Sequence, residues 1–173
     1  PPLKSFSSAI AGDVSIRSAS KQARIELSLS RQYKAVNVAK VARSLVDVVL
    51  GEAVSGTPVQ RYEDMKAIAS AVANRAARAG VSIKDVISAK GQFDAFGKSL
   101  PPGVEAVRSL AEKAVAEVMK FGPTHAGTFY ATPSATKNLP SGLQPVTKTA
   151  GHVFFDDPQN RAIATARGYK TPS

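Results

Sequence analysis

Glu52 is the residue of this chain best placed for acid–base chemistry. It lies four residues beyond Val48 on the same helical face as an apolar stripe; the stripe comprises Val38, Val41, Ala42, Leu45, Val48 and Val49. Ionising a carboxyl in apolar surroundings is costly, so the pattern predicts a glutamate that keeps its proton near neutral pH and can act as a general acid. The competing interpretation is that Gly51 ends the helix and leaves Glu52 in solvent.

Three further acids are candidates for a second catalytic carboxylate: Glu63, Asp64 and Asp94. Glu63 and Asp64 fall near the expected start of a helix, where solvated acids are common, so we expect both to be exposed. Asp94 falls in a glycine-bracketed loop, residues 91–97. It is a candidate for substrate contact, and equally an ordinary loop acid.

Histidine and cysteine chemistry are weakly supported. The chain has no cysteine, which excludes disulfides, thiolate metal sites and cysteine nucleophiles. Its two histidines, His125 and His152, lack convergent acids at ligand spacing. We therefore expect no metal and no cofactor, and we expect both histidines to form structural hydrogen bonds.

Length and charge restrict the class of protein. The 173 residues, of which 43% are apolar, suffice for one domain with a sizeable core. No run approaches the roughly 20 apolar residues of a membrane span, and no secretion signal is evident. The net charge of +10 favours polyanionic partners, including the acids of a bacterial wall. Scattered cations and the absence of tryptophan disfavour nucleic-acid binding.

The N-terminal region differs from the rest. Residues 1–30 are rich in serine and other small residues, and we expect an extended N-terminal extension or arm followed by a main domain over residues 31–173. The chain begins with Pro1 rather than methionine. This indicates a processed product or a domain excised from a longer protein.

The main domain is predicted to be mainly α (α+β). Helices are expected over residues 37–52 with Asn37 as N-cap, 62–79, 83–88, and from Pro101-Pro102 to Gly122. In the second helix, the residues expected to face inward are Met65, Ile68, Ala69, Val72 and Ala76. Two β-prone runs, residues 127–131 and 152–155, predict a small hairpin.

Five segments occur in an order that resembles a known family. They are Gly51-Glu52-Ala53, an alanine-rich helix ending in Asn74-Arg75, Gly91-Gln92-Phe93, residues 124–130 and residues 151–155. Together they resemble the cell-wall hydrolase family typified by the spore-cortex lytic enzyme SleB. The resemblance covers about residues 38–156.

The resemblance implies a lysozyme-like fold and cleavage of peptidoglycan between N-acetylmuramic acid and N-acetylglucosamine. It implies that Glu52 is the catalytic acid and that Gln92 lies in the substrate groove. From their positions beside Gln92 and in the first β-prone run, we expect Phe93, Asp94 and Tyr130 to bind substrate as well. Lysozyme-like transglycosylases need one glutamate, whereas a hydrolytic muramidase needs a second group to activate water. Since no such base can be assigned, the sequence favours a lytic transglycosylase.

Two departures favour a rival interpretation, a catalytically inactive wall-binding or structural module. The family's tyrosine before Gly-Glu is Leu50, and its tryptophan is replaced within residues 139–143. The expected partners are glycan strands and, through the arm, other subunits of an envelope or virion assembly. The expected location is the cell envelope, periplasmic or extracellular, or a phage particle.

Overall fold

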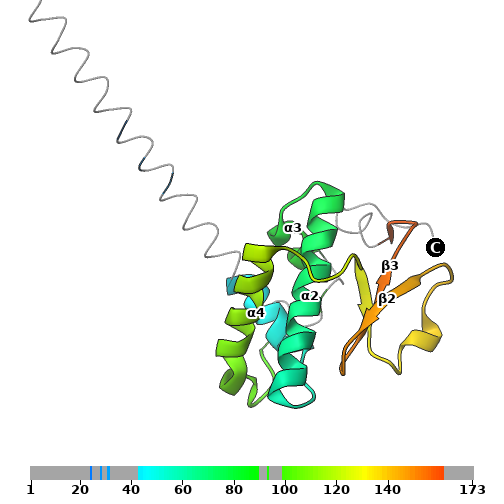
Figure 1. Ribbon diagram of the computed structural model, residues 1–173, viewed down its shortest axis with the longest axis horizontal. Coiled ribbons are helices and arrows are strands. Elements are labelled where there is room, and N and C mark those ends of the chain that lie inside the picture. The colour runs from blue at the N-terminus through cyan, green and yellow to red at the C-terminus, as the bar shows by residue number, and fades with distance from the viewer. Residues whose placement is uncertain are drawn as a thin grey trace, which may run out of the picture. The chain divides into compact units, whose positions relative to one another are not determined.

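The computed structural model describes residues 43–89 and 99–161 together with Arg24, Ser28, Arg31 and Phe93. The helices and the sheet belong to one compact unit, Val41–Ser173. In it, helix α2 lies between helix α4 and a small sheet (Figure 1). The mainly α class with a small antiparallel sheet is thus confirmed. No helix in the described part of the chain is long and apolar enough to cross a membrane.

The first described helix ends at Glu52. Residues 43–52 are helical, so Gly51 lies inside the helix and the interpretation that it ends there is wrong. The amide of Ala53 still donates to the carbonyl of Val49 at 3.0 Å, which extends the helical bonding past the glycine. Leu45 and Val48 are fully buried, as predicted. The expected N-cap, Asn37, lies outside the described residues.

Helix α2 spans Pro58–Ala79 and begins four residues before the prediction. The side chain of Thr57 accepts from the amide of Gln60 at 3.3 Å, and the amide of Thr57 donates to the side chain of Gln60 at 2.9 Å. This capping box, with Pro58 at the first helical position, explains why the helix starts before Tyr62. The helix ends at Gly80, whose φ is 66°, as predicted. All five residues expected to face inward are buried.

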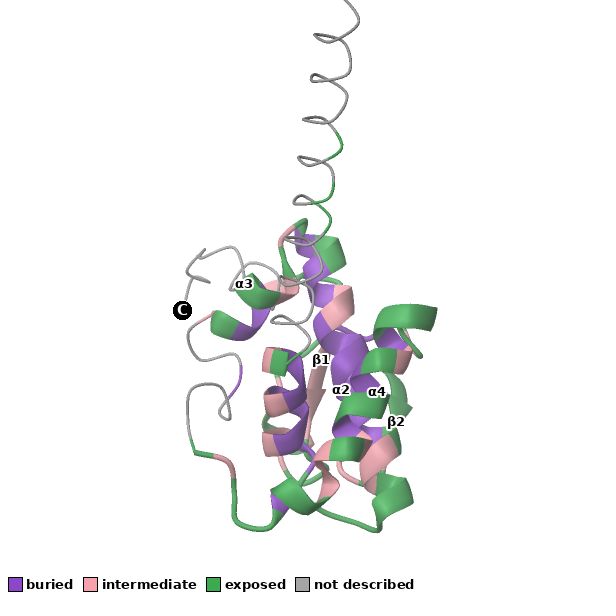
Figure 2. Ribbon diagram, turned by 90° about the vertical axis from the view of Figure 1, so that its left-hand side faces the viewer, coloured by how far each residue is buried: buried purple, intermediate pink, exposed green. Residues whose placement is uncertain are grey.

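The remaining helices are shorter. Helix α3 spans Ile83–Ser88, as predicted, with a Ser82 capping box. The fourth expected helix is instead a 3₁₀ turn, η1, over Val104–Val107 followed by α4 over Arg108–Phe121. The proline pair lies in the turn before η1, because Gly103 at φ 80° separates the prolines from the helical residues. Figure 2 shows buried positions along α2 and one side of α4.

The sheet has three antiparallel strands in the order β1-β3-β2, so the predicted two-stranded hairpin is incomplete. Strands β1 (Phe129–Ala131) and β3 (Val153–Asp156) correspond to the two predicted runs and pair with Tyr130 opposite Phe154. Strand β2 (Gln144–Lys148) was not predicted. It is an exposed edge strand with an irregularity after Pro145, and an edge tolerates the missing amide hydrogen of proline. A short η2 turn, Thr136–Asn138, lies between β1 and β2.

Of the expected N-terminal arm, the structure describes only Arg24 and Ser28, and both are helical. An extended conformation is therefore wrong at these two positions. Residues of types with high helix propensity, Lys21, Gln22 and Ala23, directly precede Arg24 in the sequence. The remainder of residues 1–30 lies outside the described residues.

Candidate active site

Glu52 is the last residue of the helix formed by residues 43–52 and is half-buried. Its neighbours Leu50 and Ala53 belong to the core, at 0% and 1% exposure. The Nε of Arg61, in the first turn of α2, donates to the carbonyl of Ala53 at 3.0 Å and so fixes the turn after the glutamate. The carboxyl group therefore stands on a rigid support at the border of the core.

Arg75 of α2 is the buried charge associated with Glu52. It is 3% exposed, and its Nε donates to the carbonyl oxygen of Thr128. Burial lowers the pKa of Arg75, while electrostatic interactions with Tyr130, Glu52 and Asp157 act in the opposite direction. A buried guanidinium is tolerated only with such partners. Arg75 thus interacts electrostatically both with the end of the first helix and with the residue that follows β3.

Aromatic rings enclose the same guanidinium. The Cζ of Arg75 lies 5.3 Å from the ring centroid of Phe93, 5.8 Å from that of Tyr130 and 6.0 Å from that of Phe129. Phe93 is buried, and its ring centroid is 6.5 Å from that of Tyr130. Of the predicted site residues, Glu52, Phe93 and Tyr130 therefore gather around Arg75. Gln92 and Asp94 lie outside the described residues.

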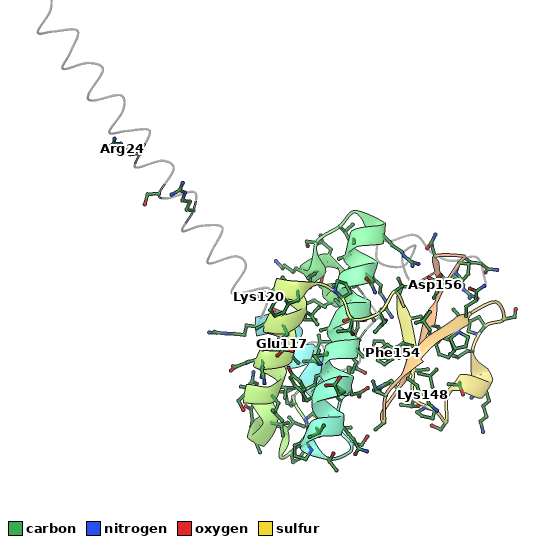
Figure 3. The ribbon with its side chains drawn as sticks, in the orientation of Figure 1. Arg24, Glu117, Lys120, Lys148, Phe154 and Asp156 are labelled. Carbon is green, nitrogen blue, oxygen red and sulfur yellow. The ribbon has the colours of Figure 1, made fainter. Side chains whose placement is uncertain are left out.

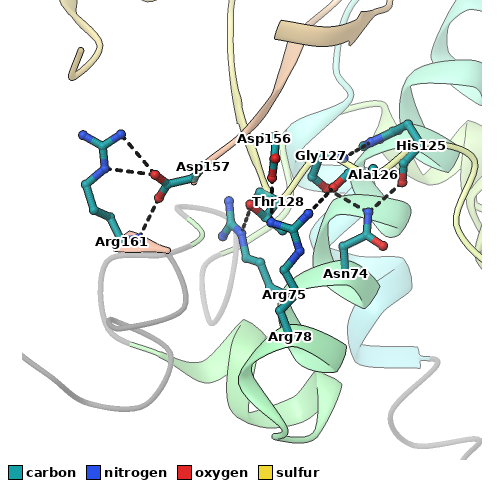
Figure 4. Close-up of polar contacts among 10 residues, drawn as sticks. All are labelled: Asn74, Arg75, Arg78, His125, Ala126, Gly127, Thr128, Asp156, Asp157 and Arg161. Atoms are coloured by element: carbon teal, nitrogen blue, oxygen red, sulfur yellow. Dashed lines mark hydrogen bonds and ion pairs between the residues drawn. The ribbon is translucent and has the colours of Figure 1, made fainter. Parts of the chain in front are cut away.

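Polar side chains on one face of α2 hold the connection between α4 and β1 (Figure 4). The Nδ2 of Asn74 donates to the carbonyls of His125 at 2.7 Å and Gly127 at 2.9 Å. Arg75 and Arg78 bind two further carbonyls of this connection. Asn74 and Arg75 therefore fix the position of β1, and α2 continues past them to Ala79. Sequence reasoning assigned these residues no role.

Comparison with known families agrees with this arrangement. A family model described as Cell Wall Hydrolase matches residues 59–155. The chain belongs to the cell wall hydrolase family. The matched span of the hydrolase includes Arg75, Phe93 and Tyr130, and Glu52 lies seven positions before its first residue. No curated protein and no solved structure matches the chain.

Membership of this family confirms the general activity that the resemblance implies, hydrolysis of the cell wall. A cell wall hydrolase acts on peptidoglycan, which is the substrate polymer that the motifs indicate. The particular likeness to SleB stays a prediction. Among the described residues, no three histidines or acids form a group that could hold a metal ion.

The hydrolase holds Asp64 differently from the prediction. Asp64 is 1% exposed rather than solvated. Its carboxylate oxygens lie 2.9 and 3.1 Å from Nδ1 of His152, and one of them accepts from the hydroxyl of Thr149. The turn before β3 covers this side of α2. Glu63, in contrast, is exposed, as predicted, and forms an ion pair with Lys66 at 3.0 Å. Burial of Asp64 thus results from a contact between residues distant in sequence.

Gly151 leaves room for this pair. A Cβ atom at residue 151 would lie 2.5 Å from Oδ2 of Asp64, which is closer than nonbonded atoms approach. We expect Gly151→Ala to displace the carboxylate or the turn and lower the free energy of unfolding by about 1–3 kcal/mol. Urea denaturation measures this change. The adjacent exposed substitution Ala150→Ser is the control, and equal stability of both variants would contradict the close packing.

His125 forms structural hydrogen bonds, as predicted. Its Nδ1 accepts from the amide of Gly127 at 3.0 Å, and its Nε2 donates to the carbonyl of Ala67 at 2.9 Å. This tautomer follows from the hydrogen bonds. The rings of His125 and Phe154 are 4.7 Å apart, and Phe154, labelled in Figure 3, is fully buried.

A pH dependence of stability follows. Burial lowers the pKa of His125 below 6.5, although the bond to Ala67 opposes the shift. The unfolded chain therefore takes up a proton at a higher pH than the folded chain, and the free energy of unfolding should fall as pH drops below about 6.5. Urea denaturation at several pH values checks this, and His125→Gln should show a shallower loss. Parallel curves would contradict the prediction.

Proposed function

We propose that this hydrolase cuts peptidoglycan glycan strands between N-acetylmuramic acid and N-acetylglucosamine, with Glu52 as general acid and base. The observation that carries the proposal is the association of half-buried Glu52 with Arg75, whose guanidinium is enclosed by Phe93 and Tyr130. An acid on a rigid support beside aromatic side chains suits protonation of a glycosidic oxygen.

The proposed reaction is that of a lytic transglycosylase. Glu52 donates its proton to the glycosidic oxygen as the bond from that oxygen to the anomeric carbon breaks, and the bonding electrons leave with the oxygen. The 6-hydroxyl of the muramyl residue then bonds to the anomeric carbon, and the Glu52 carboxylate takes up the hydroxyl proton. The product is an anhydro end, and no water is consumed.

The state of three other carboxylates supports one acid rather than two. Asp64 and Asp157 are each 1% exposed, and both are bound by neighbouring side chains. Glu63 is exposed and pairs with Lys66. These three acids are poorly suited to activate a water on a sugar. Asp94, outside the described residues, stays the candidate base of a hydrolytic muramidase.

The rival proposal is an inactive wall-binding or structural module, and the presence of Leu50 gives it little support. Leu50 is fully buried, so its side chain belongs to the core and not to a sugar-binding surface. Exchange of an aromatic residue for leucine at this position therefore removes no exposed stacking platform. Leu139 and Leu143, in the segment that lacks the family's tryptophan, are half-buried.

Incubation with purified sacculi separates these proposals. An enzyme releases soluble muropeptides with time, whereas a binding module sediments with the sacculi and releases nothing. We expect release.

We further propose that the protein acts in the cell envelope or in a phage particle, and that residues 1–30 form an arm that binds other subunits. Co-purification of these subunits with and without residues 1–30 tests the arm.

A further inference from the structure

Asp64 determines which nitrogen of His152 carries the proton. A carboxylate accepts hydrogen bonds and donates none, and its oxygens lie 2.9 and 3.1 Å from Nδ1 of His152. Nδ1 must therefore be the protonated nitrogen of the neutral ring. Nε2 then carries a lone pair. Carboxylate–histidine pairs generally fix the tautomer and orientation of the ring in this way.

Nε2 of His152 is free to accept a hydrogen bond from a ligand. Within the described residues, no protein group hydrogen-bonds to this atom. The buried side-chain polar atoms without a partner there are Nη2 of Arg61 and Oγ1 of Thr128. Nε2 is not one of them, and the side chain of His152 as a whole is 6% exposed.

The second histidine provides an internal comparison. His125 uses both ring nitrogens in bonds to backbone groups. It has no acceptor left for a ligand. His152 has one ring nitrogen held by the protein and one that is open.

Tyr130 lies beside the same imidazole ring. The rings of Tyr130 and His152 are 5.1 Å apart at an angle of 84°. Tyr130 is half-buried and also lies 5.8 Å from the guanidinium carbon of Arg75, which interacts with Glu52. His152 is thus next to Tyr130, Tyr130 is next to Arg75, and Arg75 interacts electrostatically with the proposed catalytic acid, Glu52.

We propose that His152 and Tyr130 form a subsite for an N-acetylated sugar, in which Nε2 accepts a hydrogen bond from the acetamido N–H and the phenol ring contacts the sugar. Asp64 is a positioning residue that keeps Nε2 an acceptor. The inference rests on the proposed function, because it is the glycan strand that supplies the N-acetylated sugars. Both sugars of that strand carry the acetamido group.

Asp64→Asn tests the tautomer with little change of shape. The amide oxygen can still accept from the hydroxyl of Thr149, which leaves the amide nitrogen to donate to Nδ1 of His152. The ring proton must then move to Nε2, where it turns the acceptor into a donor. Nitrogen-15 NMR of the two imidazoles reports this change, and His125 should stay constant. An unchanged tautomer of His152 would overturn the role of Asp64.

Binding is measured without cleavage, in the Glu52→Gln background, with a chito-oligosaccharide as probe and a cello-oligosaccharide as the matched sugar without acetamido groups. We expect preference for the chito-oligosaccharide, and Asp64→Asn should weaken its binding by about tenfold. A changed tautomer with unchanged affinity would overturn the subsite. Because turnover is not used, this result is independent of whether Glu52 is catalytic.

A second measurement needs no change at Asp64. In the Glu52→Gln protein, the nitrogen-15 signal of Nε2 of His152 should move on addition of the chito-oligosaccharide and not of the cello-oligosaccharide. The signals of His125 serve as reference. Failure of the Nε2 signal to move under saturating chito-oligosaccharide would contradict the proposal even if Asp64→Asn did not fold.

Discussion

Glu52→Gln is expected to slow the release of muropeptides from sacculi by about 10²–10⁴-fold. The amide has nearly the same size as the carboxyl group, so the half-buried position at the end of the helix should tolerate it. It has no acidic proton to give to the glycosidic oxygen, and it cannot take up a proton afterwards. Initial rates of release, with thermal unfolding of both proteins, measure the effect separately from stability.

Glu63→Gln is the matched control for this prediction. It makes the same change of group at an exposed acid, whose present partner is Lys66 at 3.0 Å. Its rate should stay within about twofold of the wild type, since surface substitutions away from a site have small effects. Equal losses in both variants would show that the effect is not specific to Glu52. Full activity of Glu52→Gln would refute the catalytic assignment.

Asp64→Ala should produce the largest loss of stability, about 2–5 kcal/mol in the free energy of unfolding, because it leaves two donors at a buried site without an acceptor. The substitution removes the partner of a buried histidine and of the hydroxyl of Thr149 at a position that is 1% exposed. Asp64→Asn should lose much less, because its amide keeps a bond to each of these groups. Urea denaturation near neutral pH measures both variants.

Glu63→Ala, one residue earlier in α2, is the control for the loss of a carboxylate. Its ion pair with Lys66 is exposed and should contribute no more than about 1 kcal/mol. If Asp64→Ala were no more destabilising than Glu63→Ala, the buried pair would not hold the turn before β3 against α2.

The helices could be predicted because their boundaries depend on nearby residues. Ser82 and Asp85 define α3 within four positions, and Gly80 ends α2 by adopting a left-handed φ. The same local signal, Thr57 before Pro58, was present at the start of α2. The prediction nevertheless begins the helix at Tyr62, because proline more often breaks helices than opens them.

The sheet and the polar contacts of the site depend on residues distant in sequence. Strand β2 has no alternation of buried and exposed residues, because all five of its positions are exposed. Asp64 is buried by a partner 88 positions away, and Arg75 binds a carbonyl 53 positions away. The sequence does contain a sign that Arg75 is special, since it is a charged residue among the small and apolar residues of the buried face of α2. Its partners could not be named from spacing.

Transglycosylation by Glu52 is tested most directly by the mass of the muropeptides released from purified sacculi by the wild-type chain and by Glu52→Gln. We expect anhydro muropeptides, lighter by one water than reducing ones, from the wild type and almost none from the variant. Reducing muropeptides, lost in the variant, would indicate a muramidase instead of a transglycosylase and make Asp94 the candidate base. Sacculi bound but left intact by the wild type, or cut equally well by the variant, would refute catalysis by Glu52.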